Sequence, residues 1–315
     1  MKSTLRAAIT WENILWSSLI VFIGIVGLIA PRFLTIANLT LILYSSAVLG
    51  IVAIAETIVI LSGGIDISVG AILAISASTI SELVRNGCPA FLAVLIGLAA
   101  GVCLGLINGT LTAYLRIPPI IATLATLSLF RGAIDIVVGG RAISPPSDQL
   151  EFLASGSIGP LHVQVVAFVF IALLISLILA HTRLGRLIYA VGGNSQAAEM
   201  AGVNVKNVRL MVYMMSGVLA AVAGLLFATR SASITRTAGL GIEFTSIGAV
   251  VLGGTNLFGG SGRIRGTVAG VILLYAIYNA MVIAGITATW QNAATGALII
   301  VVVSLNIFKW RFRND

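Results

Sequence analysis

The chain has 315 residues, of which 59% are hydrophobic and only 9% are charged, whereas a soluble domain carries about 25% charged residues. This composition excludes a soluble globule and predicts a polytopic membrane protein. The net charge of +8 does not indicate nucleic-acid binding, because the basic residues are not clustered with aromatic residues on a polar segment. The two cysteines lack a CxxC spacing and the two histidines stand apart, so we expect neither a metal site nor a disulfide.

About ten apolar segments are long enough to cross a bilayer, which takes about 20 residues of helix. In chain order, they are residues 14–30, 39–61, 69–84, 91–114, 119–138, 162–180, 210–228, 244–258, 266–284 and 290–307. With the N-terminus inside, all three lysines and most arginines outside the helices fall on the cytoplasmic side, as the positive-inside rule requires. We therefore predict an all-α membrane protein with both termini in the cytoplasm and one transmembrane domain over residues 1–315.

Two predicted helices are interrupted by glycine pairs, near residues 62–70 and 252–262. The pairs, Gly63-Gly64 and Gly253-Gly254, each follow an apolar run and precede polar residues, so the two segments look related. Unwound backbone at membrane depth must be buried in protein or line a wet cavity, and paired interruptions of this kind indicate a substrate path. The alternative is that glycine is simply common in membrane helices.

The candidate residues for the substrate path share these two interruptions or lie beside them. They are Glu56, Gly63, Gly64, Asp66, Ser68, Gly253, Gly254, Thr255 and Asn256. Asp66 also fits a second role, because an aspartate at the start of a half-helix accepts backbone N–H bonds as a cap. Both roles stay open for Asp66.

Glu56, Arg131 and Asp135 are ionisable residues within predicted helices, where such groups usually face a protein interior or an aqueous cavity. Arg131 and Asp135 are four residues apart on one helix face, so we predict that they pair. Glu56 has no local partner. It has three possible roles, which are to contact Arg131, to bind a helix terminus, or to line the path of a hydroxyl-rich solute.

The predicted helix 91–114 carries a stripe of glycines at every fourth position, namely Gly97, Gly101, Gly105 and Gly109. Small residues at this spacing let helix backbones approach closely. We therefore expect this helix to pack centrally in the bundle, and we assign the stripe to packing rather than to chemistry.

The longest predicted cytoplasmic loop spans residues 181–206. Asn194 or Ser195 is suited to cap a short helix over residues 196–201, and Gly202 is suited to end it in a left-handed conformation. A compact helix on the cytoplasmic face fits the docking of another protein. The alternative is an interfacial connector with no partner.

Three motifs in this order identify a resemblance. They are GGIDISVG at 63–70, GRLIYAVGGNSQAA at 185–198 and AVVLGGT at 249–255. Together they resemble the ribose-type permease family, the membrane subunits of ABC importers for ribose, xylose, arabinose, galactosides and autoinducer-2. The resemblance extends from about residue 31 to residue 307. The chain departs from the common pattern at Ile134-Asp135 and at Trp290.

The resemblance implies a permease subunit of an ATP-driven importer for a monosaccharide or sugar-like solute in the bacterial inner membrane. Its implied partners are ABC ATPase subunits, a periplasmic solute-binding protein and a second permease chain, identical or related. The 181–206 loop would couple to the ATPase through Gly185, Arg186, Tyr189, Gly192, Gly193, Asn194, Ala198, Glu199 and Gly202.

The chain contains no GxxxxGK[ST] phosphate loop, so we expect no cofactor in it, with ATP and Mg²⁺ bound by the partner subunits. Two ATPases need two coupling loops. From this, the glycine stripe and the resemblance together, we also expect a permease dimer with the path at or near its pseudo-twofold axis. One alternative function is an ion-coupled secondary transporter of a small polar solute that uses Glu56. An intramembrane enzyme is a remote alternative, because no nucleophile with a base at usable spacing is evident.

Overall fold

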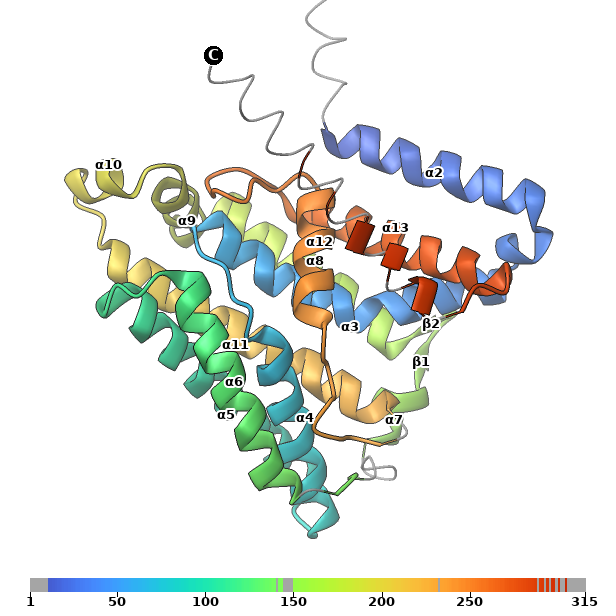
Figure 1. Cartoon of the computed structure of the whole chain (residues 1–315), viewed down its shortest axis with the longest axis horizontal. Helices are drawn as coiled ribbons and strands as arrows, with labels where there is room; N and C mark the ends of the chain where they lie inside the picture. The colour runs from blue at the N-terminus through green and yellow to red at the C-terminus, as the bar shows by residue number, and fades with distance from the viewer. Residues whose placement is uncertain are drawn as a thin grey trace, which may run out of the picture.

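The computed structural model describes residues 11–139, 141–143, 150–231 and 233–287, and between 289 and 304 the residues 289–291, 293, 294, 296, 297, 300 and 304. Figure 1 shows the arrangement of its elements. In chain order, the named elements are α2 (Trp11–Ile29), the 3-10 helix η1 (Pro31–Leu34), α3 (Ile36–Leu61), α4 (Val69–Arg85), α5 (Ala90–Gly109), the π-helix η2 (Thr110–Tyr114), α6 (Pro119–Val138), α7 (Glu151–Ser155), β1 (Ser157–Ile158), β2 (Leu161–His162), α8 (Val163–His181), α9 (Arg183–Gly193), α10 (Ser195–Met200), α11 (Val205–Arg230), α12 (Ile242–Leu252) and α13 (Ile264–Ile283).

Seven helices in the described part of the chain are long and apolar enough to cross a membrane. They are α2, α3, α5 continued by η2, α6, α8, α11 and α13. The prediction of an all-α polytopic membrane protein is therefore confirmed. The predicted helix 119–138 coincides with α6, and most of the others agree within a few residues.

The predicted span 244–258 is wrong as a continuous helix. Its counterpart α12 has only 11 residues and ends at Leu252, because the chain turns at the glycines that follow. Helix α4, the counterpart of the predicted span 69–84, has 17 residues, close to the shortest helix that crosses a bilayer. Most of the last predicted span, 290–307, lies outside the described residues.

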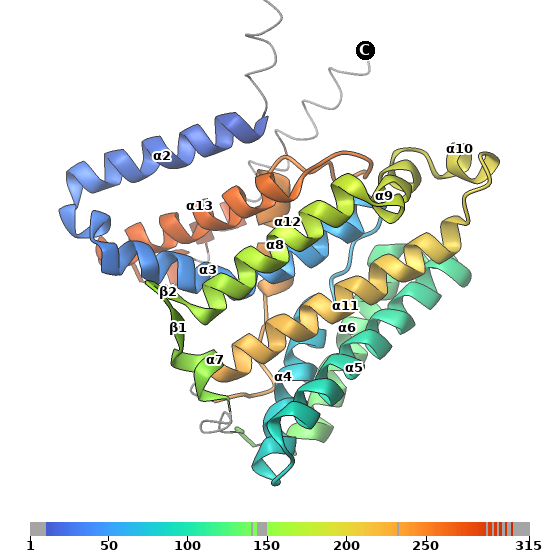
Figure 2. The same ribbon diagram turned by 180° about the vertical axis from the view of Figure 1, so that it is seen from behind.

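Helix α3 forms the centre of the bundle, and every residue from Ser46 to Leu61 is buried. It packs against α4, α8, α11, α12 and α13. Figures 1 and 2 show α4, α5 and α6 on one side of α11, and α13 and α2 on the other side of α3. Helices α9 and α10 lie at one end of the bundle, called here the α9–α10 end, and α7 with the β1–β2 hairpin lies toward the other, called here the hairpin end.

The glycine stripe of α5 is buried and lets α5 approach α4 and α11 closely, so the assignment to packing is confirmed. A Cβ added at Gly105 would overlap the carbonyl oxygen of Tyr213 in α11, and one added at Gly97 would overlap Ile80 in α4. Residues on the opposite face of α5, such as Phe91 and Leu95, are exposed in the single chain. The stripe therefore serves contacts within the chain.

Candidate transport site

The first helix interruption is an unwound segment of six residues, Gly63 to Ser68, between Ser62, which caps the end of α3, and α4. Helix α3 ends in a Schellman motif, in which the N–H of Gly64 donates to the carbonyl of Val59 at 3.0 Å and the N–H of Gly63 donates to Ile60 at 2.9 Å. Gly63 has φ +82°, the left-handed conformation that glycine adopts without strain. The prediction of an interrupted helix near 62–70 is confirmed.

Asp66 lies at the centre of a buried hydrogen-bond network that joins this segment to three helices. Its Oδ1 accepts from the backbone N–H and the hydroxyl of Ser68 at 3.0 and 2.7 Å, and from Nδ2 of Asn108 in α5 at 3.3 Å. Its Oδ2 accepts from the hydroxyl of Ser216 in α11 at 3.4 Å, and Thr126 in α6 donates to Asn108 at 2.7 Å. These five residues are at most 3% exposed, so the geometry favours the structural role of Asp66.

Glu56 binds the same segment from α3. Its Oε1 accepts from the backbone N–H of Asp66 at 3.1 Å, and its side chain is fully buried. Of the three roles considered for Glu56, this contact fits the binding of a helix terminus, because the N–H group lies just before the start of α4. No hydrogen bond between Glu56 and Arg131 is found in the described part of the chain.

The second interruption begins at the end of α12 and has the same backbone form. Gly254 has φ +85°, and the N–H of Thr255 donates to the carbonyl of Val250 at 3.2 Å. Gly254 is therefore the conformational equivalent of Gly63, and Gly253 matches Ser62. The predicted equivalence of the pairs Gly63-Gly64 and Gly253-Gly254 is therefore out of register by one residue. The two segments correspond when the left-handed residues are aligned, and not when the glycine pairs are aligned.

Asn256 organises the loop that follows α12. Its Oδ1 accepts from the N–H of Phe258 at 3.2 Å and its Nδ2 donates to the carbonyl of Gly259 at 3.1 Å. The neighbouring Thr255 is fully buried. Gly259 and Gly260 have φ +92° and +71°, so the chain here folds into a tight loop that side chains at these positions would strain.

The two interruptions meet each other and α9 through backbone contacts. The N–H of Gly260 donates to the carbonyl of Leu61, the last residue of α3, at 3.0 Å. Gly192 in α9 touches both: an added Cβ there would overlap the Leu61 oxygen and lie 2.8 Å from the Gly260 nitrogen. These three residues, Leu61, Gly192 and Gly260, are called the backbone junction below.

Tyr189, one turn earlier in α9, fixes α9 to the same loop. Its hydroxyl donates to the carbonyl of Gly262 at 2.8 Å. Burial raises the pKa of the Tyr189 phenol above its ordinary value, so the hydroxyl keeps its proton and remains a donor at neutral pH. Tyr189 and Gly192 therefore attach α9 to both interruptions.

The short helix predicted in the 181–206 loop is confirmed as α10. The side chain of Asn194 caps it by accepting from the N–H of Ala197 at 3.0 Å, and Gly202 has φ +80°. The structure adds α9, which the sequence analysis missed although its buried residues, Ile188 and Val191 among them, have helical spacing.

The remaining coupling candidates divide between the bundle and the surface. Ala198 and Gly185 are buried, and the N–H of Gly185 donates to the Thr182 hydroxyl at the start of α9. The exposed candidates are Arg186, Gly193, Asn194, Glu199 and Gly202. The loop therefore presents one face to the bundle and a second, polar face to its surroundings.

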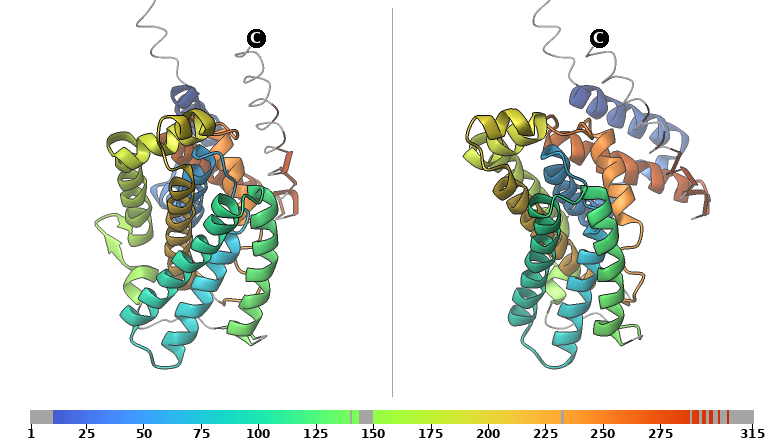
Figure 3. Two further views of the ribbon diagram at one scale, coloured as in Figure 1. Left: turned by 90° about the vertical axis from the view of Figure 1, so that its left-hand side faces the viewer. Right: turned by 60° about the vertical axis from the view of Figure 1, so that its left-hand side comes forward.

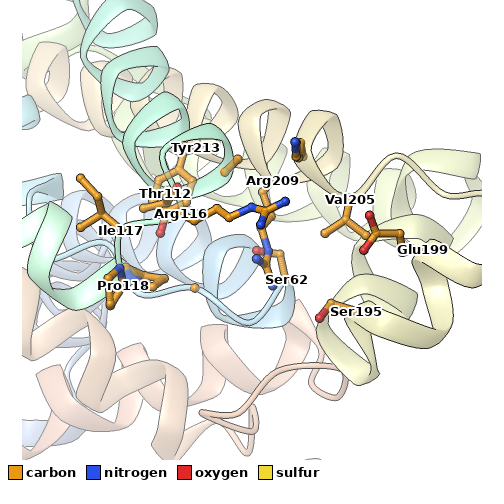
Figure 4. A pocket seen from close by; sticks show the side chains of 14 residues that line it. Ser62, Thr112, Arg116, Ile117, Pro118, Ser195, Glu199, Val205, Arg209 and Tyr213 are labelled. Atoms are coloured by element: carbon orange, nitrogen blue, oxygen red, sulfur yellow. The ribbon is translucent and has the colours of Figure 1, made fainter.

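A cavity of about 360 Å³ lies between this loop and the first interruption. Figure 4 shows Arg116 and Arg209 extending toward one another above Ser62, with Ser195 and Glu199 approaching from α10. Lys206 also lines the cavity, and the ion pairs in the described part of the chain, those of Glu12 and Glu82, include none of these side chains. Of the path candidates, only Gly64 lines this cavity, which has a net positive lining.

The predicted pair of Arg131 and Asp135 is wrong. Nη1 of Arg131 donates to the carbonyl oxygens of Arg236 and Ala238 in the segment before α12, and Asp135 is exposed. Spacing on one helix cannot reveal this contact, because the partner elements are distant in the chain.

Glu243 is a buried carboxylate that the sequence analysis missed. It lies one residue before the predicted span 244–258 and is not among the ionisable residues singled out from the sequence. The structure includes it in the first turn of α12, with an exposed fraction of 1%. The available signal was an acidic residue directly preceding an apolar run that ends in a glycine interruption.

A family model described as "Branched-chain amino acid transport system / permease component" matches residues 38–303. The ribose import permease protein of Escherichia coli strain K12 is 37% identical over 292 residues, which cover 91% of this chain and 90% of the relative. No solved structure matches.

Two further relatives have related names. The D-allose transport system permease protein of Escherichia coli strain K12 is 36% identical, covering 97% of this chain and 94% of its own. The autoinducer 2 import system permease protein of Yersinia pseudotuberculosis serotype O:1b (strain IP 31758) is 33% identical, covering 94% of this chain and 84% of its own.

Proposed function

The chain belongs to the family of transport-system permease components, and on this premise we propose that it is the membrane subunit of an ATP-driven ABC importer for a monosaccharide or sugar-like solute. The names of the ribose, allose and autoinducer 2 permeases support this solute class. As a transport subunit, the chain makes and breaks no bond of its solute. ATP and Mg²⁺ belong to partner ATPase subunits.

The proposed complex contains ABC ATPase subunits, a periplasmic solute-binding protein and a second permease chain. It lies in the bacterial inner membrane, which the bacterial relatives support. We propose about ten crossings with both termini in the cytoplasm, so the α9–α10 end faces the cytoplasm. The basic residues Arg116, Lys206 and Arg209 at that end support this orientation.

The observation that carries the mechanism is the backbone junction. Because Gly192 touches the carbonyl of Leu61 beside Gly260, a displacement of α9 acts directly on the ends of both interrupted helices. In the proposed cycle, closure of the ATPases moves α10, α9 follows through Asn194, and the interruptions reorient to change access to the path. The residues from 181 to 206 thus form the coupling loop.

Reconstitution in proteoliposomes tests the function. The chain is incorporated with its ATPase and binding protein, and uptake of radiolabelled D-ribose and D-allose is measured with and without internal ATP. We expect uptake of at least one sugar to require ATP, the ATPase and the binding protein together. Uptake by the chain alone, driven by a proton or sodium gradient, would instead establish the ion-coupled alternative.

A further inference from the structure

Helix α6 carries a polar stripe at membrane depth that the helix interruptions do not use. Ser128, Arg131 and Asp135 are spaced i, i+3 and i+7, so they lie on one helix face. Arg131 is about 18 Å along the helix from Pro119 at the α9–α10 end, at 1.5 Å rise per residue. Ser128 and Asp135 are exposed in the single chain and Arg131 is half-buried.

Glu243 approaches this stripe at the same depth from another helix. Helix α12 ends at Leu252 near the backbone junction, and Glu243 is about 14 Å back from that end. The segment before α12 contacts both side chains, because Nη1 of Arg131 donates to the carbonyl of Ala238 and Oε1 of Glu243 accepts from the N–H of Gly241. The two side chains form no ion pair within 4 Å among those of the described residues. The chain therefore holds two opposite charges against one short segment without joining them in an ion pair.

Both groups retain polar atoms without a hydrogen-bond partner among the described residues. Oε1 of Glu243 accepts from the N–H of Gly241 at 3.2 Å, while its Oε2 has none. Nη1 of Arg131 donates to backbone carbonyls, while its buried Nε and Nη2 have no acceptor. A buried unsatisfied polar atom costs about 1–3 kcal/mol, so a buried acceptor and two buried donors at one place indicate a site that is completed by a polar species.

The local packing keeps Glu243 in this position. A Cβ added at Gly70, in the first turn of α4, would overlap Oε2 of Glu243 and lie 2.7 Å from the carbonyl oxygen of Gly239. The carboxylate therefore sits against bare backbone. Lipid is no substitute partner for a half-buried guanidinium at this depth, because hydrocarbon provides no hydrogen-bond acceptor.

The polar stripe of α6 (Ser128, Arg131 and Asp135) and the first turn of α12 are together called the α6–α12 face. We propose that Arg131 and Glu243 bind the hydroxyl groups of the solute during its passage along this face, an assignment that rests on the proposed function. A hydroxyl both donates and accepts, so neighbouring hydroxyls satisfy a carboxylate oxygen and guanidinium N–H groups together. The opposite charges of the pair balance, which favours an uncharged polyhydroxylated solute over an anion or a cation. The fully buried Glu56, Asp66 and Ser68 hold the segment that leads into α4. Helix α4 packs against both α6 and α12, and Figure 3 shows it beside α6.

A double-mutant cycle tests the proposal, with one change in the protein side chain and the other in the hydroxyl group of the sugar that it would contact. ATP-dependent uptake in proteoliposomes is measured for the wild-type chain and for Glu243→Gln, each with D-ribose and with 2-deoxy-D-ribose (or with D-allose and its deoxy analogues, if D-allose is the sugar taken up). The binding protein's preference for one sugar over the other is the same with the wild-type chain and with the variant, so it cancels when the two chains are compared. Glu151→Gln, the same chemical change on an exposed residue of α7, is the control.

We expect Glu243→Gln to lower uptake of the natural sugar about tenfold, the loss that corresponds to one charge-assisted hydrogen bond. For one of the deoxy sugars, the same substitution lowers uptake less than about twofold, because the contact is already absent. Arg131→Lys is analysed in the same way, with uptake expressed per amount of folded complex, and covers the case in which Glu243→Gln does not assemble.

Three outcomes contradict the proposal in different ways. Equal losses for the natural sugar and every deoxy analogue, with both variants, mean that Arg131 and Glu243 act on the structure and not on the solute. Absence of ATP-dependent uptake by the wild-type complex overturns the proposed function, and this assignment with it. Unchanged uptake by both variants overturns this assignment alone.

Discussion

Gly192 and Gly193 are adjacent in α9 but have different surroundings. A Cβ at Gly192 would overlap the backbone of Leu61, whereas one at Gly193 would meet nothing within 4 Å. Backbone atoms cannot move aside as a flexible side chain can, so overpacking at Gly192 displaces α9 as a whole. Alanine substitutions at Gly192 and Gly193 therefore separate the effect of overpacking in the backbone junction from the effect of replacing a helical glycine by alanine.

We predict that Gly192→Ala destabilises the folded chain by about 1–3 kcal/mol, the usual range for overpacking. Thermal unfolding of the purified protein in detergent measures the change as a lower Tm. Gly193→Ala is the matched control and should leave the Tm near that of the wild type. Equal melting of the two variants would contradict the close contact in the backbone junction.

Asp66 provides a second residue-scale prediction. Asp66→Ala removes the acceptor for Ser68, Asn108 and Ser216 at once, and each donor left unsatisfied costs about 1–3 kcal/mol. We expect a strongly reduced yield of monodisperse protein by size-exclusion chromatography, while Glu151→Ala on the surface behaves as wild type. Normal yield and a normal Tm for Asp66→Ala would show that the network is not structural.

At the scale of elements, the sequence predicts whatever depends on composition and local spacing. Apolar length predicts α3 and α6, and capping residues predict α10 from Asn194 to Gly202. The same reasoning misjudges α12. Polar and glycine residues like those after Leu252 occur both where a helix ends and where a longer helix is locally broken, so the sequence does not distinguish the two cases. It also pairs Arg131 with the wrong residue, since its true surroundings come from a segment more than 100 residues away.

Helix α10 carries an element-scale prediction about docking. Met200 is 90% exposed at its last position, and an exposed apolar side chain at the end of a coupling helix is suited to a pocket on the ATPase. Met200→Glu should weaken binding of the ATPase to the solubilised chain about tenfold, through loss of apolar burial and the desolvation of a charge.

Met200→Leu is the control for docking, because it keeps the apolar area. Its affinity for the ATPase, measured by surface-immobilised titration, should lie within about twofold of the wild type. Both variants should melt as the wild type does, since the side chain touches solvent. Retained affinity in Met200→Glu would exclude Met200 from the interface.

At the scale of the whole molecule, the glycine stripe of α5 does not support the predicted permease dimer, because its contacts are with α4 and α11 of the same chain. The α6–α12 face supports it better. A half-buried Arg131 and an exposed Asp135 at membrane depth need a polar neighbour, and in the proposed dimer a facing copy of this surface would enclose a path between the two chains. Native mass spectrometry of the complex should find two permease chains per two ATPases.

Labelling at two positions, Cys88 and Met200, tests the proposed orientation. Cys88 lies in the turn between α4 and α5 at the hairpin end, and the membrane-spanning helices α5, α6 and α8 separate it from Met200. In a Cys103→Ala background, an impermeant maleimide added outside spheroplasts should label Cys88. In a second variant, in which Cys88 is also replaced and Met200→Cys is introduced, the same reagent should label residue 200 only after the membrane is permeabilised. The reverse pattern would invert the proposed orientation.

The backbone junction has a consequence for how such a protein changes over evolutionary time. Leu61, Gly192 and Gly260 meet through carbonyl, amide and Cα atoms, so the transmission of movement depends on chain geometry and on the absence of side chains. The solute contacts proposed on α6 and α12 depend on side-chain chemistry at separate positions. Under the proposed mechanism, solute preference is free to drift while the linkage to ATP hydrolysis is inherited intact.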